Sequence, residues 1–145
     1  MTEIEQYVAP SSLEQAAEYL RSGEVTILAG GTDLMPQSQG GRLKIERTLM
    51  NIRRIPELQG ISIDDGAMRI GSLATITEIM QSELVKQHLP ILVEACDHFA
   101  SDQIRNAATL GGNICNASPA GDMLVPLLVL DAEVELASKP NGSLT

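Results

Sequence analysis

The amino-acid sequence predicts an α+β fold, arranged as one domain or as two small lobes. Three observations lead to this fold class: strand-like and helix-like segments alternate near the N-terminus, an antiparallel hairpin is predicted at 61–70, and helical segments follow over 75–100. The 145 residues, 43% of them hydrophobic, are enough to bury a core. Aromatic residues make up only 2% of the chain, so we expect that core to be aliphatic.

The composition argues against several classes of partner. The chain has ten Lys and Arg and nineteen Asp and Glu, which gives a formal net charge of -9. Because this charge repels a phosphate backbone, we expect no nucleic-acid partner. No apolar run reaches the roughly 18 residues of a membrane span, and the N-terminus is acidic, unlike a signal peptide. We therefore expect a cytoplasmic protein. Cys96 and Cys115 are isolated from each other and from His, which favours reduced thiols and no metal site.

The first third of the chain predicts a helix, a strand, a glycine loop and a second strand. Residues 11–14 resemble a capping box and open a helix over 12–22. A β-prone run at 25–28 then leads into residues 29–34, the first glycine loop, where a short helix is expected to begin. A strand, a glycine turn and a helix start in this order can hold a phosphate. A further strand is expected at 48–52.

The middle of the chain predicts a hairpin followed by helices. Asp65 and Gly66 favour a type I′ turn, which sets Ile63 opposite Met68 and Ile61 opposite Ile70 on one face. A capping box at 75–78 opens a helix over 75–81, and further helices are expected at 83–88 and 90–100. The apolar stripe of the last helix is predicted to contain Ile91, Leu92, Ala95, Cys96 and Phe99.

Residues 109–122 form the second glycine segment, which has three glycines and several small polar side chains. Because glycine can adopt positive φ and approach a ligand closely, we expect a ligand-binding loop here, entered by a loop from Ser101. Neither glycine pair fits the dinucleotide or P-loop signatures. A buried helix over 123–130, a strand at 134–136 and a turn at 138–143 are expected to follow.

These motifs resemble one known family. The sequences ILAGGTDL at 27–34, TLGGN at 109–113 and ASPAGD at 117–122, in this order and spacing, are similar to the FAD-binding (medium) subunit of the xanthine dehydrogenase and carbon monoxide dehydrogenase family of molybdenum hydroxylases. The resemblance implies a two-lobed PCMH-type FAD-binding fold. Its small N-terminal α/β lobe would be 1–55, and its larger α+β lobe would be 56–145, incomplete at the C-terminus because family subunits continue further.

The resemblance also implies a function. The chain would be an FAD-dependent oxidoreductase subunit, a flavoprotein that receives electrons from a molybdenum-cofactor large subunit through an iron-sulfur small subunit and passes them to an external acceptor. The molybdenum cofactor and the iron-sulfur clusters would lie only in those partner subunits. No catalytic acid, base or nucleophile is needed, because the flavin supplies the redox chemistry. The implied FAD-binding residues are Leu28, Ala29, Gly30, Gly31, Thr32, Asp33, Leu34, Phe99, Thr109, Gly112, Asn113, Asn116, Ser118 and Asp122.

The attraction for the FAD pyrophosphate has to come from backbone N–H groups, since no Lys or Arg lies within 29–41. Two helix N-termini would be needed. A carboxylate about 4 Å from the pyrophosphate would oppose binding by about 4 kcal/mol, so we expect Asp33 to point away and cap its helix. Gly112→Val is expected to abolish FAD binding and to leave the fold unchanged.

Other interpretations of the same residues stay open. Phe99 could be a core residue, Ser118 could belong to a turn, and Asp122 could either cap the following helix or bind ribose hydroxyls. Two alternative functions also remain: a truncated, non-catalytic assembly module that no longer holds flavin, and a stand-alone flavoenzyme of the vanillyl-alcohol oxidase superfamily.

Overall fold

The computed structural model describes residues 4–137, and their contacts divide them into two compact units. The first unit contains 4–29, 33–57 and 133–137, and the second contains 30–32 and 58–132. Both helices and strands are present, as expected for an α+β fold. Each unit is made of segments that are not continuous in the sequence. The predicted lobes, 1–55 and 56–145, stay a prediction.

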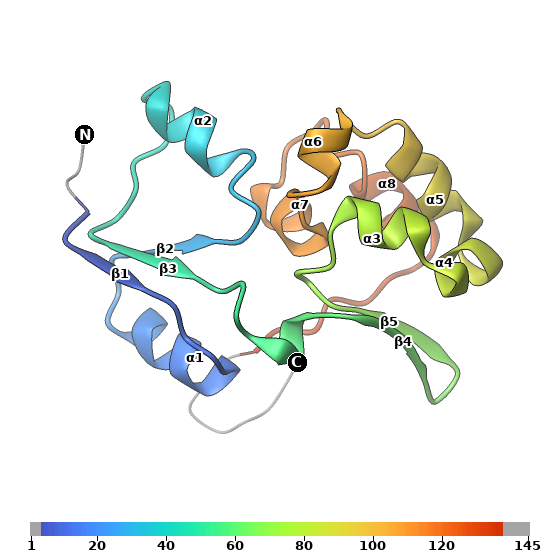
Figure 1. Ribbon diagram of the computed structural model, residues 1–145, viewed down its shortest axis with the longest axis horizontal. Coiled ribbons are helices and arrows are strands. Elements are labelled where there is room, and N and C mark those ends of the chain that lie inside the picture. The colour runs from blue at the N-terminus through green and yellow to red at the C-terminus, as the bar shows by residue number, and fades with distance from the viewer. Residues whose placement is uncertain (1–3, 138–145) are drawn as a thin grey trace. The chain divides into compact units, whose positions relative to one another are not determined.

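The first unit is built on a three-stranded parallel sheet with the order β1-β3-β2 (Figure 1). The strands are β1 (Gln6–Val8), β2 (Val25–Leu28) and β3 (Thr48–Asn51). The predicted strands at 25–28 and 48–52 are thus confirmed to within one residue. β1 was not predicted, because a three-residue strand with two exposed residues shows no hydrophobic periodicity. The central strand carries Met50, which is fully buried.

Two helices follow the strands of this unit, α1 (Leu13–Arg21) and α2 (Leu34–Gln39). The N-cap of α1 is Ser12, whose hydroxyl accepts a hydrogen bond from the Gln15 N–H at 3.2 Å. The Gln15 side chain in turn accepts from the Ser11 N–H at 3.0 Å. The capping box predicted at 11–14 is therefore wrong by one residue, because Ser12 and not Ser11 is the last extended residue before the helix.

The short 3-10 helix η1 (Pro56–Leu58) lies where the chain passes from the first unit into the second, and the second unit continues with an antiparallel hairpin, β4 (Ile61–Asp64) and β5 (Ala67–Ile70). The predicted cross-strand pairs of Ile63 with Met68 and of Ile61 with Ile70 are confirmed. Asp65 and Gly66 have φ values of 48° and 81°, as a type I′ turn requires.

The helices after the hairpin form the core of the second unit. They are α3 (Ile76–Gln81), α4 (Glu83–His88) and α5 (Pro90–Asp97), and the capping box between Thr75 and Glu78 is confirmed. α5 ends at Asp97, earlier than predicted, and the chain then turns at Ala100, which has a φ of 40°. Ile91 lies on the exposed side of α5, so its place in the apolar stripe is wrong. The core contains Ala74, Ile76, Ile79, Val85, Leu92, Cys96, Phe99, Ala108, Leu110 and Met123.

The last part of the second unit is more helical than predicted. The loop expected from Ser101 contains α6 (Asp102–Arg105), and the second glycine segment begins with α7 (Leu110–Asn116). The helix expected at 123–130 is α8 (Leu124–Val129), but three of its six residues are exposed, so the prediction of a buried helix is wrong. Residues 134–136 form no strand. The turn predicted at 138–143 lies outside the described residues.

Candidate functional site

Part of the first glycine loop lies against the residues just before the second glycine segment, within the second unit. A Cβ atom added to Gly30 would lie 2.2 Å from the carbonyl oxygen of Ala107 and 3.1 Å from the Cα of Ala108. Those two residues directly precede Thr109, where the second segment begins. Backbone atoms cannot retreat from such a contact, so this close approach requires glycine at position 30.

The backbone N–H groups of the first glycine loop are not used within the fold. In the described part of the chain, none of the six consecutive N–H groups of residues 30–35 donates a hydrogen bond. Gly31, the second residue of this run, has a φ of 77°, in the left-handed region. Successive free N–H groups around a left-handed residue form a concave site for an anion. The loop therefore has the donors that a phosphate group needs.

Asp33 stands at the N-cap position of α2 but does not act as a cap. Its φ and ψ of -100° and -42° are helical, and its side chain makes no capping hydrogen bond. A capping side chain reaches the N–H groups of the first turn only from an extended backbone, so the capping role predicted for Asp33 is wrong. Pro36, the third residue of the helix, has no N–H. The N–H groups of Leu34 and Met35 consequently stay open to a ligand.

The N-terminus of α7 presents the opposite case, because its N–H groups are all used. Thr109 is an extended N-cap whose hydroxyl accepts from the Gly112 N–H at 3.1 Å. The N–H of Leu110 donates to the carbonyl of Ala74 at 3.0 Å, and that of Gly111 donates to the carbonyl of Ser72 at 2.8 Å. This end of α7 is thus joined to the segment before α3, and it offers no free first-turn N–H to an anion.

The glycines of α7 are needed for packing and not for a turn. Neither Gly111 nor Gly112 has positive φ, and the left-handed residue of this segment is Ala117, with a φ of 50°. A Cβ at Gly111 would lie 2.6 Å from the Cβ of Ser72, and one at Gly112 would lie 2.8 Å from the Thr109 hydroxyl. The expectation that these two glycines form a loop with positive φ is therefore wrong. Their lack of a side chain instead allows Ser72 and the Thr109 hydroxyl to lie close to the helix backbone.

The other predicted residues of the second segment differ in how far they are used by the fold. The side-chain oxygen of Asn113 accepts from the Met123 N–H at 3.3 Å, and the Ser118 hydroxyl accepts from the Ala120 N–H at 3.2 Å. Asn116 ends α7 and is exposed. Asp122 is also exposed and precedes the N-cap of α8, Met123, so it is not a helix cap. Among the predicted residues of this segment, Asn116 and Asp122 are the two that are exposed.

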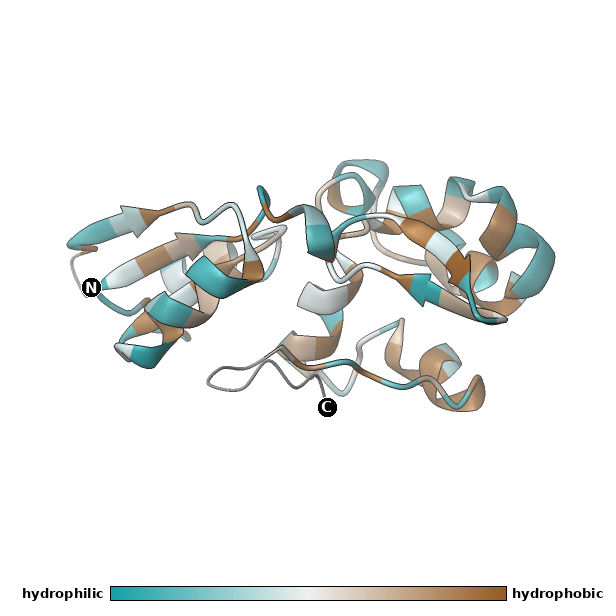
Figure 2. Ribbon diagram, turned by 90° about the horizontal axis from the view of Figure 1, so that it is seen from below, coloured by the Kyte–Doolittle hydropathy of each residue, from teal (hydrophilic) through white to brown (hydrophobic). Residues whose placement is uncertain are grey.

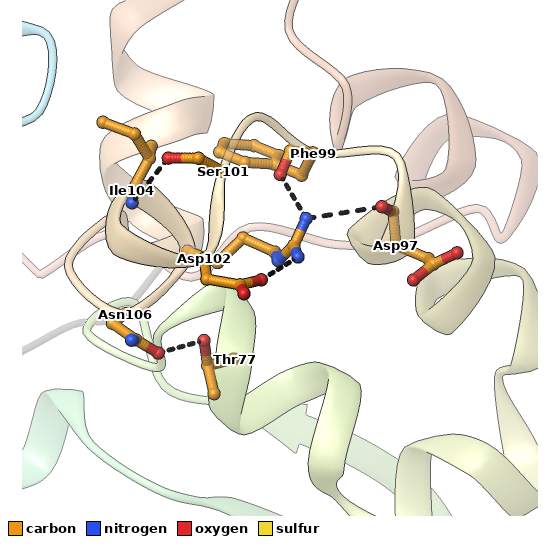
Figure 3. Close-up of polar contacts among 8 residues, drawn as sticks. Thr77, Asp97, Phe99, Ser101, Asp102, Ile104 and Asn106 are labelled. Atoms are coloured by element: carbon orange, nitrogen blue, oxygen red, sulfur yellow. Dashed lines mark hydrogen bonds and ion pairs between the residues drawn. The ribbon is translucent and has the colours of Figure 1, made fainter.

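Phe99 belongs to the hydrophobic core, and its backbone belongs to a polar cluster (Figure 3). The residue is 7% exposed, so little of it could meet a ligand. Its carbonyl accepts from the Arg105 guanidinium at 2.9 Å, and the carbonyl of Asp97 accepts from the same nitrogen at 3.4 Å. Asp102 forms an ion pair with Arg105 (Figure 3). Arg105 therefore joins the end of α5 to α6.

The role of Arg105 was missed from the sequence. Its spacing of three residues from Asp102 indicates an ion pair, but nothing local predicts the two carbonyl acceptors. At the end of α6, the Thr77 hydroxyl and the Asn106 side-chain oxygen are 2.6 Å apart, which ties this helix to α3 (Figure 3). α6 is thus held at both ends, immediately before the residues that contact Gly30.

The two cysteines are in different surroundings. Cys96 is fully buried, and burial raises the pKa of its thiol from 9.0 to about 11, partly offset by the charge of Arg105. Cys115 is exposed on α7. Among residues 4–137, no group of three or more His, Cys, Asp or Glu is placed to hold a metal ion, and no helix has the length and apolar character needed to cross a bilayer.

Comparisons with known proteins agree on one family. Residues 2–143 match the family described as the FAD binding domain in molybdopterin dehydrogenase. The chain is 37% identical over 144 residues to the xanthine dehydrogenase FAD-binding subunit of Escherichia coli O157:H7. This alignment covers 98% of this chain and 49% of that protein. It is 33% identical over 142 residues to the carbon monoxide dehydrogenase medium chain of Hydrogenophaga pseudoflava, with 97% and 49% covered.

Solved structures show the same relationship. A carbon monoxide dehydrogenase from Hydrogenophaga pseudoflava aligns with a TM-score of 0.77 at 33% identity, over 82% of this chain and 42% of that chain. The reconstituted enzyme from Oligotropha carboxidovorans aligns with a TM-score of 0.78 at 32% identity, over 85% and 44%. The chain spans about half the length of the curated relatives it matches. On this basis, the chain belongs to the family of FAD-binding domains of molybdopterin dehydrogenases.

Proposed function

We propose that this chain binds FAD as part of the flavin subunit of a molybdenum hydroxylase, and that electrons reach the FAD from iron-sulfur clusters in a partner subunit and leave to an external acceptor. The observation that carries the proposal is the run of six unused N–H groups at 30–35, in a chain whose family binds FAD. These donors match the one strongly anionic part of FAD, its pyrophosphate.

The N–H groups of 30–35 would hold the pyrophosphate. A hydrogen bond to a charged group contributes about 1.5–3 kcal/mol, so three or four of them outweigh the weak repulsion from distant carboxylates, which salt screens beyond about 8–10 Å. Asp33 is exposed and its side chain makes no capping hydrogen bond, so its carboxylate can turn to solvent. A protein of net charge -9 can therefore bind this anion through its backbone.

The exposed polar side chains of the second segment would bind the hydroxyl groups of FAD. A carboxylate such as that of Asp122 accepts two hydroxyl hydrogen bonds, and the Asn116 amide can donate and accept. Thr109, Asn113 and Ser118 would contact FAD from the positions in which their hydrogen bonds hold their side chains. The remaining contacts proposed for FAD are those of Leu28, Ala29, Thr32, Leu34, Phe99 and Gly112.

Bound FAD would supply the electron-accepting and electron-donating chemistry, and the chain would bind and orient it. Partners are proposed from the names of the relatives. One of them is called a medium chain and another an FAD-binding subunit, which are names for components of larger enzymes. A molybdenum-cofactor large subunit and an iron-sulfur small subunit are the partners we propose.

The proposal is tested by comparing FAD with FMN, which lacks the pyrophosphate and the adenosine. Flavin fluorescence is titrated with the purified chain and with a chimera that continues it with the unmatched half of the Escherichia coli subunit. We expect FAD to bind at least about tenfold more tightly than FMN, a difference of about 1.4 kcal/mol. Equal affinity for the two flavins, or no binding of either by both proteins, would contradict the proposal.

A matched pair of variants assigns the binding to the first glycine loop. Gly31→Ala forces a side chain into a φ of 77°, and Gly66→Ala does the same at 81° in the hairpin turn. Both cost about 1–2 kcal/mol of backbone strain, so their stabilities should fall alike. Only Gly31→Ala should weaken FAD binding. If both variants keep the affinity of the parent chain, the first glycine loop does not hold the pyrophosphate.

A further inference from the structure

Arg105 closes a turn that the fold keeps at a cost. Its side chain is 14% exposed, and one terminal nitrogen donates to the carbonyls of Phe99 and Asp97 while the other pairs with a carboxylate (Figure 3). Within the turn, Ala100 has a φ of 40°, a left-handed conformation that is unfavourable for a residue with a side chain. The Nε of Arg105 is buried and has no hydrogen-bond partner in the described part of the chain, which is a second cost. Strain and unpaired donors of this kind persist where a fold fixes a segment for more than its own stability.

The same segment fixes the backbone that faces Gly30. α6 ends at Arg105, and the N–H of Ala107 donates to the carbonyl of Ile104 at 3.0 Å, which holds Ala107 at the end of this helix. The helix is mostly teal in the hydropathy colouring, so polar contacts and not apolar burial hold it in place (Figure 2). The Ala107 carbonyl lies against Gly30, where a Cβ atom would be 2.2 Å away. Because these two backbones are in contact, a movement of Ala107 changes the place of Gly30 and of the free N–H groups at 30–32.

We propose that Arg105 is a positioning residue for the first glycine loop. It fixes α6 and Ala107, and through them it keeps the N–H groups of residues 30–32 where they can donate to the pyrophosphate. This inference rests on the proposed function, because it assigns these N–H groups to FAD. Hydrogen bonds weaken steeply when donor and acceptor are misaligned, so a small shift of the loop is enough to weaken binding. Loss of Arg105 would therefore misplace the donors even in a protein that is still folded.

The first test compares FAD affinity with stability. Arg105→Ala is paired with Val85→Ala, which truncates a fully buried side chain on α4, a helix without a proposed FAD contact. Urea denaturation identifies conditions in which both variants are folded. Under those conditions, flavin fluorescence is titrated with the chain and with the chimera used to test the proposed function. The affinity for FAD should fall at least about tenfold in Arg105→Ala and change less than about twofold in Val85→Ala. Equal affinities of the two variants overturn the proposal.

The second test needs no flavin. In the chain without FAD, the amide NMR resonances of residues 30–32 should move in Arg105→Ala and keep their positions in Val85→Ala. Arg105→Lys separates the hydrogen bonds from the charge, because lysine has a single nitrogen, whereas Arg105 uses one for two carbonyls and another for Asp102. We expect Arg105→Lys to move the same resonances. Resonances of 30–32 that stay in place in Arg105→Ala, or that move in Arg105→Ala and not in Arg105→Lys, overturn the proposal.

The two tests separate this proposal from the proposed function. If neither the parent chain nor the chimera binds FAD, the proposed function is wrong, and the resonances of 30–32 still decide whether Arg105 positions the loop. If they bind FAD and Arg105→Ala binds it as tightly as the parent does, the proposed function stands and this proposal is overturned. If Arg105→Ala does not fold, Arg105→Lys takes its place in the affinity test, and in the second test its resonances at 30–32 should move, with unmoved resonances overturning the proposal.

Discussion

The carbonyl oxygen of Ala107 lies so close to Gly30 that no side chain fits between them. This contact joins the glycine loop after β2 to the short connection between α6 and α7. The connection is itself fixed, because the Ile76 N–H donates to the Ala108 carbonyl at 3.0 Å and the Ala108 N–H donates to the Ile104 carbonyl at 2.7 Å. The position of residues 30–32 in the second unit thus depends on residues more than seventy positions further along the chain.

The Gly30 contact predicts that Gly30→Ala is destabilising. The added methyl group would lie 2.2 Å from a backbone oxygen, so the loop or α6 has to shift, at a cost of about 1–3 kcal/mol. Gly40→Ala is the control, because its φ is -76° and its nearest contact is 3.2 Å away. Urea denaturation should show the larger loss for Gly30→Ala, and equal losses would mean that the contact with Ala107 is not tight.

The Thr109 cap predicts a coupling between positions 109 and 112. Gly112→Ala should displace the Thr109 hydroxyl, 2.8 Å from the new Cβ, and remove the cap at a cost of about 0.5–2 kcal/mol. In a Thr109→Ala background the same change should cost little, because the cap is already absent. A double-mutant cycle measured by thermal unfolding gives the coupling. Additive effects would show that the substitution at Gly112 does not act through the Thr109 cap.

The Arg105 cluster predicts a large effect of its removal. Arg105→Ala would leave the carbonyls of Phe99 and Asp97 without their charged donor, and we expect a loss of about 2 kcal/mol in the free energy of unfolding. Lys86→Ala breaks only the exposed pair with Glu83 and should cost less than about 0.5 kcal/mol. Chemical denaturation checks both values. A loss no larger than that of Lys86→Ala would show that water replaces Arg105.

The buried thiol of Cys96 predicts a loss of stability at alkaline pH. Its pKa is raised to about 11 in the folded protein, so between pH 9.0 and 11 the unfolded state loses this proton first. Because the unfolded state then binds fewer protons than the folded state, stability falls as the pH rises through this range, by up to about 3 kcal/mol. Cys96→Ala should have a flatter profile over the same pH range. Parallel profiles for the two proteins would contradict the assignment.

Much of the secondary structure could be predicted because its causes are local. The hairpin at 61–70 follows from the Asp65-Gly66 turn and alternating apolar residues, and α3 begins where the Thr75–Glu78 capping box places it. α6 and α7 were missed because they are short and carry little hydrophobic periodicity. The glycine motifs, with their order and spacing, pointed to the FAD-binding family that the comparisons then showed.

The candidate site was harder to predict, because the two glycine segments look alike in sequence and differ in how their N–H groups are used. Leu110 and Gly111 find acceptors on Ala74 and Ser72, more than thirty residues away, whereas residues 30–35 find none in the described chain. Hydrogen-bond partners and close contacts between distant segments are set by tertiary packing, which no local pattern encodes. The sequence by itself determined the family and the local elements, and only the tertiary structure decided which glycine segment keeps its N–H groups open.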